Sequence, residues 1–212
     1  MAATFSTGER RPGTLVGRLK AASLINNIAI AREVLGEGKL GELLKPLPEE
    51  TRTLFQRRLL AVEWVDADEW LAFQQAMLDV NFGGDEVRMR QFMHKVCERD
   101  FNTFYKIILK LSSARTVLTR APKIWMTYAE PGELQVAILK EKDGATEAMV
   151  RLIGFETNHQ VFAVLLHAFI EQVLRMTGAR EIDVKRTRLD HSPGSARTPG
   201  RLSVDLLARF RD

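Results

Sequence analysis

Cysteine is almost absent from this sequence of 212 residues, which contains only Cys97. A single cysteine excludes an internal disulfide and favours a reducing compartment. Long apolar runs are absent too. The longest nearly apolar run covers residues 161–170, about half of the roughly 20 residues that a membrane-spanning helix needs. The first residues, MAATFSTGERRPG, lack the apolar core of a secretion signal. We therefore expect a cytoplasmic protein without a membrane span.

The common catalytic and nucleotide-binding motifs are missing as well. The sequence has no G-x-x-x-x-G-K-[ST], G-x-G-x-x-G, G-x-S-x-G or H-E-x-x-H pattern. This excludes the nucleotide-binding and hydrolase classes that these motifs identify, although other enzyme classes stay open on this ground. We predict that the protein is not an enzyme.

A basic surface for nucleic acid is also not indicated. The chain has 31 Lys and Arg against 27 Asp and Glu, a formal charge of +4. All of the excess lies in residues 185–212, so residues 1–184 are balanced. Phe210 is the only aromatic residue of that tail, which gives little support for stacking on bases. Nucleic acid is therefore an improbable partner.

The periodicity of apolar residues predicts a helical N-terminal region. We expect a disordered arm at residues 1–13 and then a helix over residues 14–35 that ends at two glycines. Further helices are expected near residues 48–60, 67–80 and 86–99, with Asp66 and Asp85 as N-caps. Two segments after Phe101 and a short helix that begins at Pro122 complete this region.

At residue 133 the apolar period changes from helical to alternating. Residues 133–141 and 146–155 predict a hairpin around the turn Asp143-Gly144. An apolar helix over residues 158–177 and a strand over residues 181–186 follow. The fold class is therefore α+β, mainly α: an N-terminal helical region followed by a β-β-α-β unit with a small antiparallel sheet. One domain is expected over residues 14–190.

The last residues, 191–212, have the composition of a basic linker and a short amphipathic helix. Three interpretations are open: a solvated tail, a helix that docks on a partner or on the body of the protein, and contact with nucleic acid or a membrane. The apolar face of this helix would form the partner-binding residues, which are Leu202, Leu206, Leu207 and Phe210.

Two groups of reactive side chains are candidate sites. His94 and Cys97 are three residues apart, but they supply two ligands where a structural zinc site needs four. Cys97 falls on the apolar stripe of its helix, so we expect a core position for it rather than a metal ligand or a reactive thiol. His167 and Glu171 are four residues apart, and we expect a polar helix face rather than an acid–base pair. No metal site is predicted.

The sequence resembles a family of roughly 200-residue myxobacterial proteins of unknown function, with many paralogues. The resemblance spans residues 14–190 and rests on LGEGKLGELLKPLPEE (35–50), LLAVEWVDADEWLAF (59–73), NFGGDE (81–86), RAPKIWMTYAEPGELQV (120–136), RLIGFE (151–156) and RMTGAREIDV (175–184). The order of elements is also similar to that of haem-nitric-oxide-binding, vinyl-4-reductase and transport-particle (TRAPP) domains.

In that wider group, the resemblance implies a crevice between the helices and the sheet that accepts a cofactor, a small hydrophobic molecule or an acyl chain. The haem proteins of the group carry a proximal histidine and a Y-x-S-x-R motif. Here Tyr105 is followed by KIIL and Tyr128 by AEPG, so the motif is absent. The cysteine-based metal site of the vinyl-4-reductase type is absent too. We therefore expect no cofactor.

The leading hypothesis is a non-enzymatic regulatory or adaptor module that binds a small apolar ligand or a helix of a partner protein. Its alternatives are a self-associating scaffold protein, which would form a homodimer, and a haem or gas sensor with an incomplete motif. Large side chains where the helices should meet the sheet would line the pocket, unless they only fill the core. They are Phe104, Ile108, Trp125, Tyr128, Phe162 and Leu166.

Overall fold

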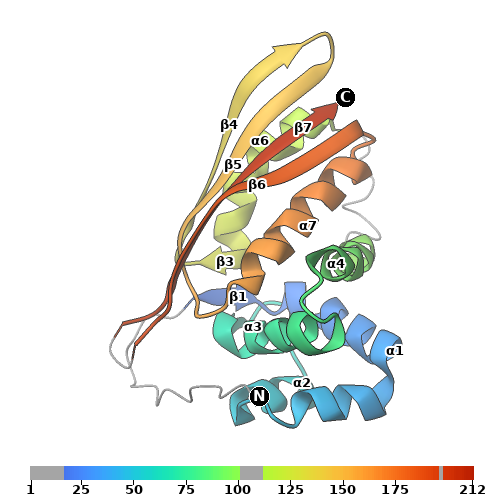
Figure 1. Ribbon diagram of the computed structural model, residues 1–212, viewed down its shortest axis with the longest axis vertical. Helices are drawn as coiled ribbons and strands as arrows, with labels where there is room; N and C mark the ends of the chain where they lie inside the picture. Colours follow the sequence, from blue (N-terminus) through green and yellow to red (C-terminus); the bar gives the residue numbers. More distant parts are fainter. Residues whose placement is uncertain (1–16, 101–111, 196–197) are drawn as a thin grey trace.

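The computed structural model describes residues 17–100, 112–195 and 198–212 (Figure 1). Its helices are α1 (Ala22–Leu44), α2 (Glu49–Gln56), α3 (Ala67–Ala76), the π-helical η1 (Met77–Asn81), α4 (Glu86–Asp100), α6 (Ala114–Tyr128) and α7 (Val161–Met176). Its strands are β1 (Arg18–Lys20), β2 (Trp64–Asp66), β3 (Ala129–Glu130), β4 (Glu133–Lys142), β5 (Ala145–Glu156), β6 (Arg180–Ser192) and β7 (Arg201–Arg211). The predicted α+β class is confirmed.

The larger sheet is antiparallel, with the strand order β4-β5-β7-β6. Its first hairpin is the predicted one. Asp143 and Gly144 both adopt positive φ angles, 52° and 77°, as a tight two-residue hairpin turn requires. Helices α6 and α7 lie along one face of this sheet, and the helices of the N-terminal half are gathered near one end of α7 (Figure 1). The protein therefore has a sheet layer and a helical layer, with the core between them.

The prediction of a C-terminal helix is wrong. Residues Arg201–Arg211 form β7, which lies between β5 and β6 in the middle of the sheet. Leu202, Leu206 and Phe210 are buried in the core at 0%, 0% and 2% exposure, while Leu207 lies half-buried on the other face. A spacing of four residues suits one face of a helix and one face of a strand alike. The neighbouring strands decide for the strand, so the domain extends past residue 190 to the end of the chain.

The start of the first helix is also corrected. Residues 18–20, which were expected to be helical, form β1 between β2 and β3 in a second, three-stranded sheet. Gly17 precedes it against the backbone of Glu156, where an added Cβ would stand 2.0 Å from the carbonyl oxygen. Helix α1 then continues past the expected end, with a kink at Gly36, whose φ is 72°.

Several expected helix boundaries are confirmed by their caps. The Asp66 carboxylate accepts a hydrogen bond from the Asp68 amide at 2.8 Å, and Asp85 accepts from the Val87 amide at 2.9 Å. Pro122 was expected to begin a helix, but it lies inside α6, which begins after Ser113. The expected helical segment over residues 104–111 and the arm at residues 1–13 lie outside the described residues. No described helix is both long and apolar enough to cross a membrane.

Candidate functional site at the α4–α7 interface

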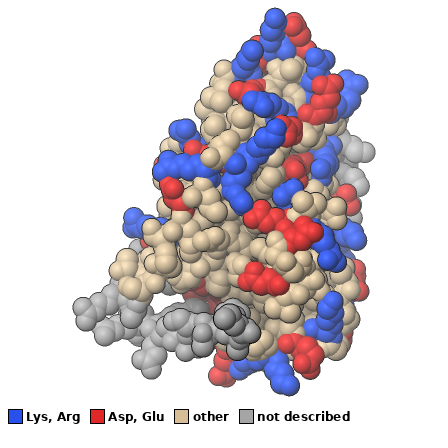
Figure 2. Space-filling view, viewed as in Figure 1, with Lys and Arg blue, Asp and Glu red and all other residues tan. Residues whose placement is uncertain are grey.

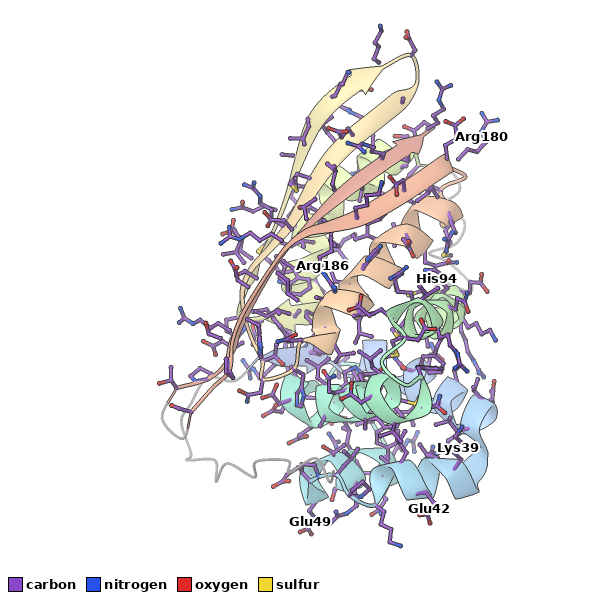
Figure 3. All side chains as sticks on the ribbon, viewed as in Figure 1. Lys39, Glu42, Glu49, His94, Arg180 and Arg186 are labelled. Atoms are coloured by element: carbon purple, nitrogen blue, oxygen red, sulfur yellow. The ribbon has the colours of Figure 1, made fainter. Side chains whose placement is uncertain are left out.

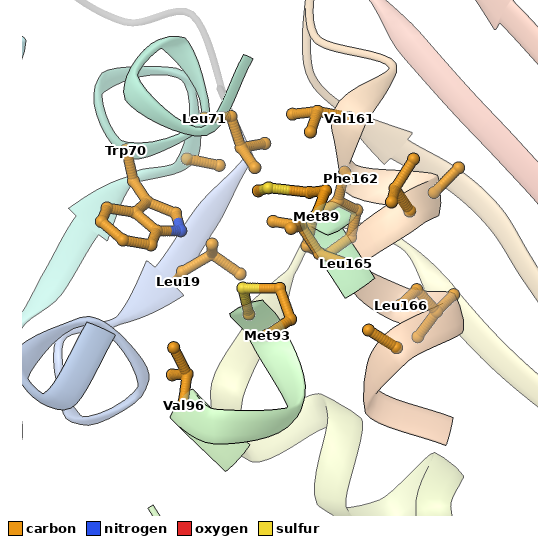
Figure 4. Close-up of a cluster of buried hydrophobic side chains, with 14 of the residues drawn as sticks. Leu19, Trp70, Leu71, Met89, Met93, Val96, Val161, Phe162, Leu165 and Leu166 are labelled. Atoms are coloured by element: carbon orange, nitrogen blue, oxygen red, sulfur yellow. The ribbon is translucent and has the colours of Figure 1, made fainter. Parts of the chain in front are cut away.

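Helices α4 and α7 pack against each other through an apolar interface (Figure 4). Met89 and Met93 of α4 are 0% and 7% exposed, and they lie opposite Phe162, Leu165 and Leu166 of α7. The spacing of the apolar residues along each helix places them on one stripe, as expected for a helix that buries one face. Because methionine is unbranched and flexible, this interface can adjust its shape more easily than one built from branched side chains.

An aromatic cluster adjoins this interface. The ring of Phe162 stacks on Phe155 of β5 with centroids 4.5 Å apart. Trp125 of α6 lies 5.6 Å from the Phe155 ring and 6.0 Å from the Phe162 ring. The indole nitrogen of Trp125 donates a hydrogen bond to the carbonyl of Gly132 at 3.1 Å. Elements distant in the sequence therefore meet at one aromatic centre.

The structure brings part of the predicted pocket wall together. Trp125 and Phe162 are in contact, and Leu166 lies one turn beyond Phe162 on α7. Phe162 and Leu166 are buried, whereas Trp125 and Tyr128 are half-buried. Phe104 and Ile108 lie outside the described residues. The expectation that these side chains surround a ligand stays a prediction, because Phe162 and Leu166 are also members of the hydrophobic core and Trp125 packs against it.

At the edge of the same interface, Glu171 of α7 forms the centre of a polar cluster. Its Oε2 lies 2.9 Å from Nε2 of His94 on α4. Its Oε1 lies 3.3 Å from Nε2 of His167, one turn earlier on α7, without the alignment of a hydrogen bond. Arg90 of α4 approaches the carboxylate at 3.6 Å. The Glu171 side chain is only 14% exposed. The expectation that His167 and Glu171 lie on a solvated polar helix face is therefore wrong.

His94 of α4, which is labelled in Figure 3, contacts two charged side chains of α7. Its Nε2 lies 2.9 Å from Oε2 of Glu171. Nη1 of Arg175 lies 2.9 Å from Nδ1 and 3.2 Å from Nε2 of the same ring. Because one guanidinium nitrogen is close to both ring nitrogens, these contacts join α4 to α7 without selecting one tautomer of the imidazole.

The cluster also fixes the charge of Glu171. Burial by itself would raise the pKa of this carboxyl group. The adjacent His167 and His94, together with the charge of Arg90, outweigh burial and hold the pKa of Glu171 well below its ordinary value. The carboxylate is therefore ionised at any physiological pH.

Cys97 is buried at 3% exposure, which confirms the core position expected for it. Across the described ranges, no group of three His, Cys, Asp or Glu side chains has an arrangement that could hold a metal ion.

Sequence reasoning missed a second polar junction, which joins α3 to the start of α7. Asp68 lies in the first turn of α3, and its carboxylate accepts hydrogen bonds from the Thr157 hydroxyl at 2.6 Å and from the Asn158 side-chain amide at 2.6 Å. Asn158 in turn accepts from the Gly194 amide at 2.8 Å. Burial lowers the pKa of the nearby His159, although Asp68 opposes this. No local pattern signals this junction, because its members are far apart in the sequence.

Comparison with known proteins finds similarity in structure alone. No protein-family model matches the chain, and no curated protein matches it. Among solved structures, a Cs H-NOX mutant aligns with a TM-score of 0.60 at 14% identity, covering 92% of this chain and 97% of that chain. The I5F mutant of T. tengcongensis H-NOX aligns with a TM-score of 0.56 at 13% identity, covering 90% and 98%. The chain has an H-NOX-like fold.

A third structural neighbour is described as an oxygen-binding H-NOX domain related to soluble guanylate cyclases. It aligns with a TM-score of 0.56 at 12% identity and covers 91% of this chain and 94% of that chain. Such low identity shows a shared fold and carries no residue's role across. The wider resemblance inferred from the order of elements is confirmed to that extent.

The described residues do not fit a haem bound through His94. A haem-ligating histidine needs one ring nitrogen free for the iron, and its other nitrogen then donates a hydrogen bond. Here Nε2 lies 2.9 Å from Glu171, and Nη1 of Arg175 lies 2.9 Å from Nδ1 and 3.2 Å from Nε2. Iron binding at either nitrogen would have to break a contact of a charged and largely buried cluster. His94 is a structural link between two helices in this fold.

Proposed function

We propose that this H-NOX-like chain is a non-enzymatic regulatory module that binds a small apolar ligand at the α4–α7 interface, without a haem iron on His94. One observation carries the proposal. The fold aligns over nine-tenths of the chain with domains of which one is described as oxygen-binding, yet both ring nitrogens of His94 are in contact with charged side chains, those of Glu171 and Arg175. A ligand-binding fold is thus supported, while the chemistry of haem ligation at this histidine is not.

The chemistry of the interface indicates the class of ligand. The buried surfaces of α4 and α7 are apolar, and Met89 and Met93 are side chains that can repack around a guest. A neutral or weakly polar molecule, such as an acyl chain, would exchange apolar contacts for apolar contacts. A strongly charged ligand would lose its hydration there without a compensating partner.

Native mass spectrometry of the protein purified from its own host tests this proposal. We expect the mass spectrum to show a bound apolar molecule. In thermal denaturation with added ligands, we expect fatty acids to raise the thermal midpoint of the protein and haem to leave it unchanged. If the spectrum shows only free protein, and if none of these compounds changes the thermal midpoint, the proposal of an apolar ligand is wrong. A shift with haem accompanied by a Soret band would show that the reasoning from His94 is wrong.

A matched pair of variants locates the site. Leu166→Phe adds volume at the α4–α7 interface, and Leu54→Phe makes the same change in α2, where Leu54 is also buried. Both substitutions overpack the core and cost about 1–3 kcal/mol. We expect Leu166→Phe to weaken ligand binding at least tenfold and Leu54→Phe to leave it unchanged. Equal effects would place the ligand elsewhere.

Self-association is a second candidate, favoured by the outer face of the large sheet. Ala137, Met149 and Leu207 are neighbours across β4, β5 and β7 on the face opposite the helices. Leu207 is the one predicted partner-binding residue that the fold leaves on this face. Sedimentation of the wild-type protein and of a Leu207→Glu variant tests the idea. A dimer that the variant dissociates supports it, and monomers in both samples remove it.

Three other expectations stay open. They are membership of the myxobacterial family, the cytoplasmic location and the lack of enzymatic activity. Nucleic acid stays an improbable partner, because Lys and Arg are interspersed with Asp and Glu on the visible surface instead of forming one basic region (Figure 2).

A further inference from the structure

An open pocket of about 320 Å³ lies at the end of the large sheet where β4 turns into β5 and where β7 ends (Figure 1). We call it the tip pocket. Its volume is at the lower end of the range of small-molecule sites, about 300–1,000 Å³. The charged residues of its wall are four cations and two carboxylates: Lys140, Lys142, Arg209, Arg211, Glu147 and Glu181. Two positive charges are therefore in excess around the tip pocket.

The register of the sheet shows where this excess arises. In the inner row of the pocket, the charges alternate from strand to strand. Lys140 lies opposite Glu147, Glu147 lies opposite Arg209, and Arg209 lies opposite Asp183. The guanidinium of Arg209 pairs with Glu147 at 2.5 Å. Such alternation of opposite charges across neighbouring strands is favourable, so this row needs no added ligand.

The last row of the sheet is different, because its four positions contain cations and one small residue. Lys142 lies opposite Ala145, Ala145 opposite Arg211, and Arg211 opposite Arg180. Figure 3 shows Arg180 at this end of the sheet. Like charges directly opposite each other are unfavourable in an antiparallel pair. Since Ala145 has only a methyl group, the row also leaves space between the side chains of Lys142 and Arg211.

Neighbouring acids neutralise this row only weakly. Arg211 pairs with Glu181 at 3.3 Å, but the Glu181 side chain is 72% exposed. Lys142 and Asp143 are 4.0 Å apart and both largely exposed, and ion pairs of this kind contribute little. Among the described residues, Arg180 has no ion-pair partner. An anion above Ala145 would therefore relieve a repulsion that the protein leaves uncompensated.

We propose that the tip pocket binds the phosphate group of a small phosphomonoester, which Lys140, Lys142 and Arg211 hold above Ala145. A phosphomonoester carries a charge of about −1.5 to −2 near neutral pH, which matches the two excess positive charges. A carboxylate would neutralise only one of them. Phosphate oxygens also accept charge-assisted hydrogen bonds from ammonium and guanidinium groups alike. The proposal does not depend on the apolar ligand at the α4–α7 interface.

NMR of the full-length, ¹⁵N-labelled protein near neutral pH tests this site. The probes are inorganic phosphate and glycerol 3-phosphate, with sodium chloride at matched ionic strength as the reference. We expect both phosphates to cause saturable shifts of the amides of Gly144, Ala145 and Arg211, and no shifts in α2. Added salt should weaken the binding, because these charges are exposed. If neither phosphate causes saturable shifts at these amides, the proposal is wrong.

Vesicles of phosphatidylcholine, with and without phosphatidic acid, identify the source of the phosphate. Sedimentation of the protein with the phosphatidic acid vesicles alone would assign the phosphate to a lipid headgroup. Binding of glycerol 3-phosphate without sedimentation would assign it to a soluble molecule. Either result, together with the NMR shifts, supports the site.

A matched pair of double variants locates the binding. Lys140→Gln with Lys142→Gln should weaken phosphate binding about tenfold, because it removes the two excess charges. Lys39→Gln with Lys45→Gln makes the same change of charge at exposed positions near the end of α1 and should leave the binding unchanged. Full binding by the first variant, or equal weakening in both, would refute the assignment.

The Ala145→Glu variant separates lost binding from damage to the fold. It places a carboxylate opposite Lys142 and Arg211, where we expect the phosphate. We expect it to abolish the phosphate-induced shifts without lowering the thermal midpoint, since opposite charges across strands are favourable. A lower thermal midpoint, or phosphate binding as in the wild type, would contradict the argument from the last row.

Discussion

Leu206 and Leu207 are adjacent leucines of β7 that face opposite sides of the sheet, and they allow a sharp test of the fold. Leu206 is 0% exposed within the core, whereas Leu207 is half-buried on the outer face. Leu206→Ala should lower the free energy of unfolding by about 3–4 kcal/mol, because it removes buried methyl groups and leaves a cavity. Leu207→Ala should cost about 1 kcal/mol or less, since its side chain is already partly in water.

Urea denaturation followed by circular dichroism gives both values. For a protein of this size, the thermal midpoint should fall by about 10 °C for Leu206→Ala and by about 3 °C for Leu207→Ala. A tethered amphipathic helix would bury neither leucine in the body of the protein, and both substitutions would then be nearly neutral. Two equal and small losses would therefore show that β7 is not the centre of the sheet.

Four further predictions concern Gly200, Gly41, Asp68 and His159. Gly200→Ala should destabilise the protein by about 2 kcal/mol or more, because an added Cβ would stand 2.4 Å from the carbonyl oxygen of Thr157. Gly41→Ala should stabilise the protein by about 0.5–1 kcal/mol, because a Cβ added at this position of α1 meets nothing within 4 Å. Asp68→Ala should cost about 2–3 kcal/mol in urea denaturation, since it removes the acceptor of three hydrogen bonds. Burial lowers the pKa of His159 in the folded protein, so as the pH falls the unfolded chain takes up this proton before the folded protein does. The free energy of unfolding should therefore decrease as the pH drops below about 6.5. The thermal midpoint of the His159→Gln variant should fall less than that of the wild type over the same pH range.

Local patterns were enough to predict the elements whose signals are contained within a few residues. The turn Asp143-Gly144 combines two residues that tolerate positive φ angles, and the strands on either side alternate in polarity, so the hairpin of β4 and β5 could be read directly. Asp66 and Asp85 marked helix starts because a cap bonds to amides only two or three residues away. The core position of Cys97 followed from helical spacing alone.

The candidate site could be predicted only in part. Phe162 and Leu166 stood out as large apolar residues of one helix, and the fold does bring Phe162 against Trp125. The polar cluster was missed, because His94 and Glu171 are 77 positions apart in the chain. Only His167 and Glu171 shared a local spacing, and that spacing is equally typical of a solvated helix face.

The sequence by itself determined the α+β class, the helix caps, the first hairpin and the apolar stripes of α4 and α7, because each of these depends on interactions between residues close along the chain. The tertiary structure alone decided that residues 201–211 form a central strand, that residues 18–20 pair with β2 and β3, and that two histidines meet one largely buried carboxylate. Those features arise from hydrogen bonds and charges between distant segments. A pattern that is compatible with two local structures is settled by the partner that the fold places beside it.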